Sequence, residues 1–347
     1  MKAVVMKGDE MQLSHDRSLP KLRDDYVLVK PHSVALNPTD WKHVAYRRAK
    51  DGALVGCDYA GVVEEVGRAV TKRWQKGDRI CGCTHGSNLV NEEDGAFAEW
   101  IVAKGDVQMR IPAKLVYEKA ATVSLGAITV GQGLYQKSLK LNLPTNPIRK
   151  KEYILIYGGG TATGGLAIQY AKLSGYCTIS VCGQGDFKRL RNLGADFCFD
   201  YQDPTIGKTI RMLTENNLRY AWDTIAIESS ARICADALST SPGTRYGTTN
   251  PIQSPRVDVE SSSVVMYTMF GEPFTFGDRE FAASPEDFDF AKMFMNLTEN
   301  LLEEGKLKTH PEILREGGLA GVIQGLDELK SGKVSSGKLV YRITDTP

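Results

Sequence analysis

The sequence has almost no net charge and little that would suit a secreted protein. Its 347 residues carry 43 Lys and Arg against 42 Asp and Glu, a formal net charge of +1, so no overall basic field is available to hold nucleic acid. Seven cysteines occur without any Cys-x-x-Cys pair. An odd number of cysteines argues against a secreted disulfide framework and favours a reducing compartment, the cytoplasm.

Long uninterrupted apolar segments are also missing. The two longest uncharged stretches, residues 120–136 and 153–171, are broken by glycines and threonines, so neither is typical of a membrane span. Charged residues interrupt the run from Met1 to Asp9 too early for a signal peptide. We therefore expect neither a membrane nor a nucleic-acid partner.

Metal-ligand spacings are scarce. None of the five histidines forms a His-x-x-x-His pair. The cluster Cys81-Gly82-Cys83-Thr84-His85 leaves one residue between its cysteines, which is a poor chelate spacing, and we interpret it as a strand end with buried thiols. A Gly-x-Ser-x-Gly elbow is absent, so a serine hydrolase is not indicated. The sequence predicts no metal site.

What is present is the balance of a globular protein, with 42% hydrophobic and 24% charged residues and a length typical of two domains. The first third is predicted to be β-rich. Clusters of Gly, Pro and Asp separate its expected strands, which are residues 3–6, 26–34, 60–66 and 79–82.

Beyond residue 153 strands alternate with helices, which indicates a parallel sheet covered on both faces. The predicted strands are residues 153–157, 177–182, 196–199, 220–224 and 245–247, and the predicted helices are 162–173, 187–193 and 229–238. One helix is expected over 119–139, and a strand over 264–270. Helices over 285–302 and 321–329 and a strand over 339–343 end the chain. The simplest architecture is a β-rich domain, a Rossmann-like insertion and a tail that returns to the first domain.

The glycine-rich turn at residues 158–165 is the strongest single signal. An apolar strand leads into it and an apolar helix follows, an arrangement that directs backbone N–H groups and a helix N-terminus at a pyrophosphate. A plain turn is the alternative. No acid stands at the end of the next strand, around Cys182, where NAD enzymes hold the ribose 2′-hydroxyl, and Lys188 and Arg189 follow. NADP is therefore favoured, unless these two cations are only a solvated helix face.

Several motifs together resemble the medium-chain dehydrogenase/reductase family, over nearly the whole chain. They are Asn37-Pro38-Thr39-Asp40, the run from Gly56-Cys57-Asp58 to Gly67, Gly77-Asp78-Arg79-Ile80, Gly194-Ala195-Asp196, Asp200-Tyr201, Asp223-Thr224, Gly305–Lys308 and Gly332-Lys333. Zinc-containing members have a cysteine in place of Asn37, a histidine in place of Cys57 and a lobe of four cysteines. The resemblance thus implies a zinc-free member. The loop Gly160-Thr161-Ala162-Thr163 is similar to that of the fungal trans-acting enoyl reductases of polyketide synthesis, of the lovastatin-pathway type.

This resemblance implies an α/β fold with a GroES-like substrate domain and a Rossmann cofactor domain. The expected boundaries are 1–118 for the first part of the GroES-like domain, 119–275 for the Rossmann domain and 276–347 for the return. The implied NADPH-binding residues are Pro38, Thr39, Asp40, Trp41, Gly160, Thr161, Ala162, Thr163, Gly183, Gln184, Gly185, Asp186, Tyr201, Gly247, Thr248, Val334 and Ser335. The implied substrate-lining residues are Ser124, Leu125, Gly126, Ala127, Ile128, Thr129, Val130, Gly131, Thr268, Met269, Phe270, Gly271 and Glu272.

The activity implied is NADPH-dependent reduction of an α,β-unsaturated thioester held on the acyl carrier domain of a separate polyketide synthase or synthase–peptide synthetase hybrid. Lys42 and Thr129 are the predicted catalytic residues. Lys42 has a second interpretation, as a surface lysine on a helix that also carries His43, Arg47 and Arg48. The alternative functions are a stand-alone quinone or alkenal reductase and a non-catalytic NADPH-binding protein. A monomer is expected, although zinc-free relatives often dimerise through an edge strand that residues 264–270 would supply here.

Overall fold

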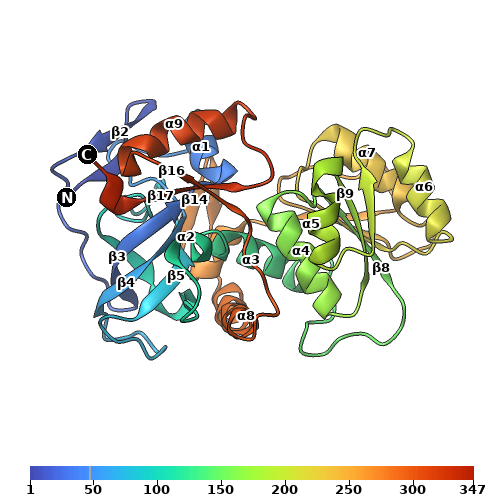
Figure 1. The fold of residues 1–347 in the computed structure, drawn as a ribbon, viewed down its shortest axis with the longest axis horizontal. Coiled ribbons are helices and arrows are strands. Elements are labelled where there is room, and N and C mark those ends of the chain that lie inside the picture. Colours follow the sequence, from blue (N-terminus) through green and yellow to red (C-terminus); the bar gives the residue numbers. More distant parts are fainter. Residues whose placement is uncertain (47) are drawn as a thin grey trace. The chain divides into compact units, whose positions relative to one another are not determined.

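The computed structural model describes residues 1–46 and 48–347 and divides the chain into two compact units (Figure 1). The first unit is made of Met1–Leu125 and Tyr267–Pro347, and the second is Gly126–Met266. The units change over at residues 125/126 and 266/267, compared with the expected 118/119 and 275/276. The chain leaves the first unit once and returns once, as the expected order of segments requires.

The first unit is built on a seven-stranded sheet. Its strands run in the order β16 (Glu312–Arg315), β17 (Lys338–Arg342), β3 (Tyr26–Ala35), β4 (Asp58–Val66), β5 (Arg79–Cys83) and β7 (Met109–Arg110), with β6 (Ile101–Lys104) also paired to β3. Two hairpins are added, β1 (Ala3–Lys7) with β2 (Glu10–Ser14) and β14 (Phe274–Phe276) with β15 (Arg279–Phe281). Alternating apolar residues of these strands form one buried core together with α9 (Gly318–Lys330).

Three other helices belong to the first unit, namely α1 (Pro38–Ala45), α2 (Tyr117–Ala120) and α8 (Pro285–Glu303). The predicted ranges for α8 and α9 agree with the structure to within a turn. Helix α8 begins at residues suited to a helix start: Ser284 caps it, since its hydroxyl accepts a hydrogen bond from the Asp287 N–H, and Pro285 occupies the first turn.

The second unit has a six-stranded, wholly parallel sheet in the order β10-β9-β8-β11-β12-β13. This order, third-second-first-fourth-fifth-sixth along the chain, is that of the dinucleotide-binding fold. The strands are β8 (Tyr153–Tyr157), β9 (Cys177–Cys182), β10 (Phe197–Asp200), β11 (Tyr220–Asp223), β12 (Arg245–Thr248) and β13 (Glu260–Ser263). Four helices accompany them, α4 (Ala162–Leu173), α5 (Phe187–Asn192), α6 (Ile206–Leu213) and α7 (Glu228–Ala237). The predicted α/β class with a Rossmann sheet is confirmed.

Two predicted elements are wrong. The expected strand over residues 264–270 is a 3₁₀ helix, Met266–Phe270, and the sheet edge is β13, which comes before it. The edge strand invoked for dimers therefore does not exist at those residues. The continuous helix expected over 119–139 is broken into α2, α3 (Ser124–Val130) and a π-helix, Gly131–Gln136. The wider turn fits its setting, because a Cβ on Gly133 would overlap the Trp222 ring, which presses against the backbone there.

Within the described residues, no helix is long and apolar enough to cross a membrane, and no group of three or more His, Cys, Asp or Glu side chains could hold a metal ion.

Candidate functional site

The glycine-rich loop of the second unit turns directly from β8 into α4. Gly158 leaves the strand with φ +77°, a conformation that favours glycine. Thr161 then caps α4: its hydroxyl donates to the Gly158 carbonyl (2.8 Å) and accepts from the Gly164 N–H (2.9 Å). The exposed N–H groups of a 12-residue helix thus begin at the predicted phosphate-binding residues.

Glycines in this loop leave room that a side chain would fill. A Cβ on Gly164 would overlap the Gly158 carbonyl oxygen, one on Gly159 would overlap the Ser180 hydroxyl, and one on Gly160 would overlap the Asp186 carboxylate. Glycine at these positions therefore allows the loop to pack closely against its own backbone, Ser180 of β9 and Asp186, with its N–H groups at the start of α4. These residues fit a dinucleotide cofactor.

We expect Gly164→Ala to weaken NADPH binding at least about tenfold, or 1.4 kcal/mol, because the new methyl group pushes the loop away from the helix start. Calorimetric titration with NADPH measures the change. Gly165→Ala is the matched control on the same turn, since its Cβ would meet the Arg189 Nη1, the Leu193 Cδ1 and the Gly159 carbonyl oxygen at ordinary distances of 3.5, 3.6 and 3.8 Å. Equal NADPH affinities in the two variants would contradict the prediction.

The end of β9 brings most of the residues predicted for the 2′-phosphate together. Gly183 lies 3.8 Å, measured from a Cβ built on it, from the half-exposed ring of Tyr201. The Gln184 amide donates to Asp200 (2.8 Å). Arg189 is not a free cation, however, because its Nη2 binds both Asp186 (2.7 Å) and the Gly160 carbonyl (3.0 Å). Lys188 is the exposed cation next to it.

A carboxylate that sequence reasoning did not select orders the neighbouring strand end. Asp223 is fully buried at the end of β11 and accepts hydrogen bonds from the N–H groups of Ile225 and Ala226, the Ser230 hydroxyl and the Tyr246 hydroxyl, at 2.6–2.9 Å. It fixes the turn that carries Thr224, whose hydroxyl lies 3.0 Å from that of Thr161. In the sequence, the motif Asp223-Thr224 is the signal that could have identified this carboxylate as a site residue.

Gly247 and Thr248, also predicted for the cofactor, end β12 opposite Trp222 and Asp223 of β11. They therefore lie at the same carboxyl edge of the sheet as the glycine-rich loop, the edge where open parallel sheets bind ligands. Val334 and Ser335 belong to the first unit, in the loop between α9 and β17.

In the first unit, α1 carries Lys42 and the residues predicted for the nicotinamide. Asn37 precedes the helix and Pro38 occupies its first position. The Asp40 carboxylate accepts the Asn37 N–H at 2.7 Å, and the Asn37 side chain donates to Asp58 at 3.0 Å. Trp41 packs against the core. Buried hydrogen bonds and packing, rather than contacts at the surface, hold this segment in place.

Asp58 connects three parts of the first unit. It is fully buried and accepts from the Asn37 side chain before α1, from the Leu125 N–H at the start of α3 (2.8 Å) and from the Lys338 ammonium at the start of β17. A buried ion pair with these extra hydrogen bonds fixes the relative position of the three chain segments.

Lys42 is half-buried, with its Nζ 5.8 Å from the centre of the Trp41 ring. Desolvation, followed by the nearby charge of Arg48, lowers the pKa of the Lys42 ammonium. The alternative of a shared solvated face does not suit His43, which is buried and whose pKa desolvation lowers to about 4. Arg48 lies beyond the end of α1, and Arg47 is outside the described residues.

Burial also controls the pKa of Asp40, which lies on the same helix as Lys42. Desolvation raises the pKa of Asp40 to about 7; the Asn37 N–H, the Cys57 thiol and Lys338 act in the opposite direction, and Asp58 adds to the rise. Since the folded-state pKa is raised, protonated Asp40 stabilises the fold below its ordinary pKa near 4, and this contribution is lost as the pH rises to about 7.

Asp40→Asn keeps an oxygen for the Asn37 N–H but does not titrate. We expect the free energy of unfolding of this variant, relative to the wild type, to rise by roughly 4 kcal/mol between pH 4 and pH 8, because one pKa unit corresponds to about 1.4 kcal/mol. Denaturant unfolding at pH 4, 6 and 8 measures it. A difference that does not change with pH would contradict the raised pKa.

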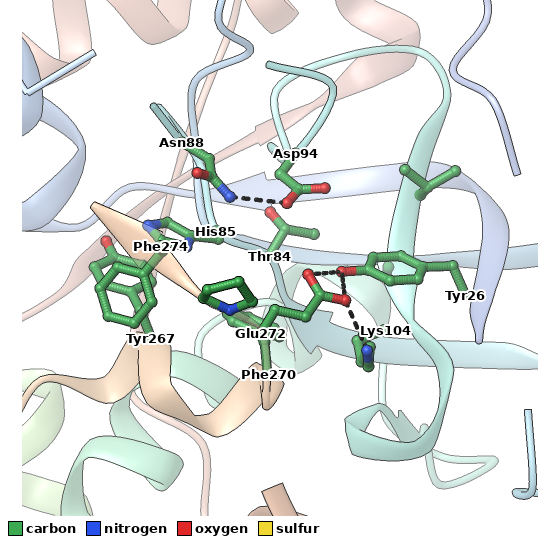
Figure 2. A pocket seen from close by; sticks show the side chains of 13 residues that line it. Tyr26, Thr84, His85, Asn88, Asp94, Lys104, Tyr267, Phe270, Glu272 and Phe274 are labelled. Carbon is green, nitrogen blue, oxygen red and sulfur yellow. Dashed lines mark hydrogen bonds and ion pairs between the residues drawn. The ribbon is translucent and has the colours of Figure 1, made fainter. Parts of the chain in front are cut away.

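A small pocket in the first unit has one aromatic and one polar side (Figure 2). His85, Tyr267, Phe270 and Phe274 form the aromatic side, where the rings of His85 and Tyr267 stack with their centres 3.9 Å apart. On the polar side Glu272 accepts from the Tyr26 hydroxyl (2.8 Å) and pairs with Lys104 (2.7 Å).

The predicted substrate-lining residues fall into two groups. Phe270 and Glu272 line this pocket, whereas Met269 is buried against the Cys83 thiol (3.7 Å) and Gly271 packs under Phe288. Thr268 lies in the same 3₁₀ helix as Met269 and Phe270. Seven of the eight residues over 124–131 are buried, the exception being Leu125, and Thr129 is 7% exposed. Tyr267, which sequence reasoning missed, lies at the centre of the aromatic side.

Comparisons with known proteins agree on one family. The model for the alcohol dehydrogenase GroES-like domain matches residues 23–113. The trans-enoyl reductase resD of Aspergillus sclerotiorum is 44% identical over 362 residues, covering 99% of this chain and 100% of its own. The trans-enoyl reductase TOXD of Cochliobolus carbonum is 52% identical over 275 residues, covering 79% of this chain and 92% of its own.

The fold has solved counterparts. An alcohol dehydrogenase superfamily protein from Novosphingobium aromaticivorans, at 21% identity, superposes with a TM-score of 0.79 over 99% of both chains. At this identity the likeness concerns the fold alone, and it confirms the pairing of a GroES-like part with a Rossmann part.

Proposed function

Because this chain belongs to the trans-enoyl reductase family of oxidoreductases, we propose that it reduces the α,β-unsaturated thioester of a polyketide intermediate held on the carrier domain of a separate synthase or synthase–peptide synthetase hybrid. The observation that carries the proposal is the 44% identity to a trans-enoyl reductase over the whole length of both chains. We further propose that the protein works as a monomer, a state that light scattering at micromolar concentration tests.

NADPH is the proposed cofactor, and when bound it supplies the hydride. The loop from Gly160 to Thr163 would hold its pyrophosphate, because the backbone N–H groups at a helix start suit that group. Near Gly183 the Asp200 carboxylate accepts the Gln184 amide, and the Asp186 carboxylate is paired with Arg189. With that charge neutralised, exposed Lys188 can attract a 2′-phosphate.

We therefore expect NADPH to bind at least about tenfold more tightly than NADH, a difference of 1.4 kcal/mol. Calorimetry with both nucleotides measures it. Lys188→Met should reduce the preference by weakening NADPH binding only, whereas Lys208→Met, which removes a surface lysine from α6, should not. Equal affinities of the wild type for the two nucleotides would overturn the 2′-phosphate argument.

On the substrate side, Lys42 and Thr129 are the proposed donors toward the thioester oxygen, where negative charge develops as the β-carbon receives hydride. A half-buried ammonium with a lowered pKa suits this role because little water competes for its hydrogen bonds. The aromatic side of the pocket in Figure 2 offers apolar surface to an acyl chain.

The decisive experiment compares NADPH oxidation with three acceptors: a free quinone, a free enoyl thioester and the same enoyl group on a carrier protein. The proposal expects the carrier-bound substrate to give the highest kcat/KM. Equal or faster turnover of the quinone would favour a stand-alone quinone or alkenal reductase. NADPH binding without turnover of any acceptor would favour a non-catalytic protein.

A further inference from the structure

A chain of hydroxyl and thiol groups crosses the interior of the first unit, beginning at the start of α1. The Tyr267 hydroxyl lies 2.8 Å from the Thr39 hydroxyl and 3.6 Å from the Cys57 sulfur. Tyr267 is 3% exposed and cannot easily turn away, because its ring is stacked on His85 and meets the edge of His43 at 5.6 Å between ring centres. Figure 2 shows this ring beside His85 and Phe274.

His43 approaches Thr39 as a hydrogen-bond donor. Its Nδ1 lies 2.8 Å from the Thr39 carbonyl oxygen and 3.3 Å from the Thr39 hydroxyl. Since a carbonyl can only accept, the geometry assigns the proton to Nδ1. The hydrogen bond between the Thr39 and Tyr267 hydroxyls can run in either direction; when Tyr267 is the donor, the Thr39 proton can point to a group outside this chain. Thr39 is partly exposed, in contrast to Tyr267.

The inner end of the chain is an acid. Asp40 is 1% exposed, and its Oδ1 has no hydrogen bond of normal geometry with any described residue. Cys57 is also buried; its thiol lowers the pKa of Asp40, and Asp40 raises the pKa of Cys57. Along the series from Thr39 through Tyr267 and Cys57 to Asp40, the ordinary acidity of the groups increases, from alcohol to phenol, thiol and carboxylic acid. A proton therefore moves outward along the chain in the favourable direction.

We propose that Tyr267 supplies the proton that completes the reduction, by passing it through the Thr39 hydroxyl to the α-carbon of the substrate, with Cys57 and Asp40 as the buried end of the relay. This inference rests on the proposed function. Thr39 is the catalytic residue, since its oxygen would touch the reacting carbon, and Tyr267 acts through it. Burial supports the arrangement, because it raises the pKa values of Tyr267 and Cys57 and keeps both groups protonated.

The atoms balance without an added reagent. Hydride addition forms the C–H bond at the β-carbon and moves the π electrons onto the thioester oxygen, giving an enolate. The enolate electron pair then forms a C–H bond at the α-carbon with the Thr39 proton. Tyr267 returns a proton to Thr39, Cys57 returns one to Tyr267, and Asp40 returns one to Cys57. A proton taken up from the solvent restores the Asp40 acid when the product leaves, so each turnover consumes one hydride and one solvent proton.

The test uses the full-length protein with NADPH and crotonyl-pantetheine in D₂O. Two quantities are followed: the turnover rate, and which of the two α-hydrogen positions of the product carries deuterium by NMR. Thr39→Val and Tyr267→Phe should each lower turnover at least about tenfold, within the range for loss of one general acid. Both should scramble the deuterium between the two α positions, since unguided water then protonates the enolate.

Thr39→Ser keeps the hydroxyl and should retain the deuterium at one position. Tyr59→Phe is the matched control, because Tyr59 is likewise fully buried and its hydroxyl bonds a side chain, Gln108 at 2.9 Å, away from the relay. NADPH affinity by calorimetry should be unchanged in Tyr267→Phe and Tyr59→Phe. A selective label and turnover within twofold of wild type in Tyr267→Phe, or in Thr39→Val if Tyr267→Phe does not fold, would overturn the relay alone. A wild type that does not reduce crotonyl-pantetheine in either free or carrier-bound form would overturn the proposed function and the relay with it.

Discussion

Lys338→Met is expected to lower the free energy of unfolding by about 3–5 kcal/mol, the usual cost of leaving a buried charge without its partner. The side chains of Lys338 and Asp58 are 4% and 0% exposed, and Asp58 is the acceptor that joins the segments before α1, at the start of α3 and at the start of β17. Methionine fills similar volume but leaves the carboxylate uncompensated. Denaturant unfolding followed by circular dichroism measures the loss.

Two further variants show whether that loss of stability comes from the buried ion pair. Lys306→Met breaks a surface pair with Glu304 (2.7 Å, side chains 58% and 51% exposed) and should cost less than about 1 kcal/mol. The double variant Lys338→Met/Asp58→Asn removes both charges and should recover part of the stability. A Lys338→Met protein as stable as Lys306→Met would mean that the buried pair does not hold the fold.

Lys42→Met is expected to slow carrier-linked enoyl reduction at least tenfold and up to about 10²–10³, the range for losing one donor to a developing oxyanion. The ammonium is half-buried on α1, directly after the segment predicted to border the nicotinamide. Desolvation is the main cause of its lowered pKa. The interaction strengthens only as charge develops, so kcat should fall while NADPH affinity stays.

Lys50→Met is the matched control. Lys50 follows the same helix by five residues and makes only an exposed pair with Glu92 at 3.6 Å, so its loss should leave turnover unchanged. Steady-state kinetics of both variants at saturating NADPH give the comparison. A near-wild-type kcat in Lys42→Met would mean that Lys42 is only a surface lysine. Thr129 would then remain as the predicted donor to the thioester oxygen.

Local signals in the sequence predicted the fold of the second unit well. Residues 153–157 are apolar without interruption, three glycines follow, and an apolar helix begins where Thr161 can cap it, so each level of structure agrees with the next. The prediction failed where tertiary contacts decide. Val264 and Val265 favour a strand, yet the chain turns at once into the 3₁₀ helix that places Tyr267 against His85.

The long-range contacts of the site left no local signal. Asp58 meets Lys338 across 280 residues and Tyr267 meets Thr39 across 228, and no spacing rule links such positions. Family resemblance named Thr39 and Lys42 as site residues. It covered Tyr267 but assigned it no role, because a tyrosine in an apolar run is ordinary core material until its hydroxyl partner is known.

The cysteines have a consequence for the chemistry that this protein handles. Desolvation is the largest cause of a raised pKa at all seven, and six are buried while Cys177 is partly covered. An enoyl thioester is a Michael acceptor, whose β-carbon is attacked by thiolates but hardly by neutral thiols. An enzyme that binds such electrophiles turn after turn is at risk of being alkylated by its own substrate. In the proposed enzyme, the raised pKa of all seven thiols and the burial of six of them protect the catalyst from its own substrate.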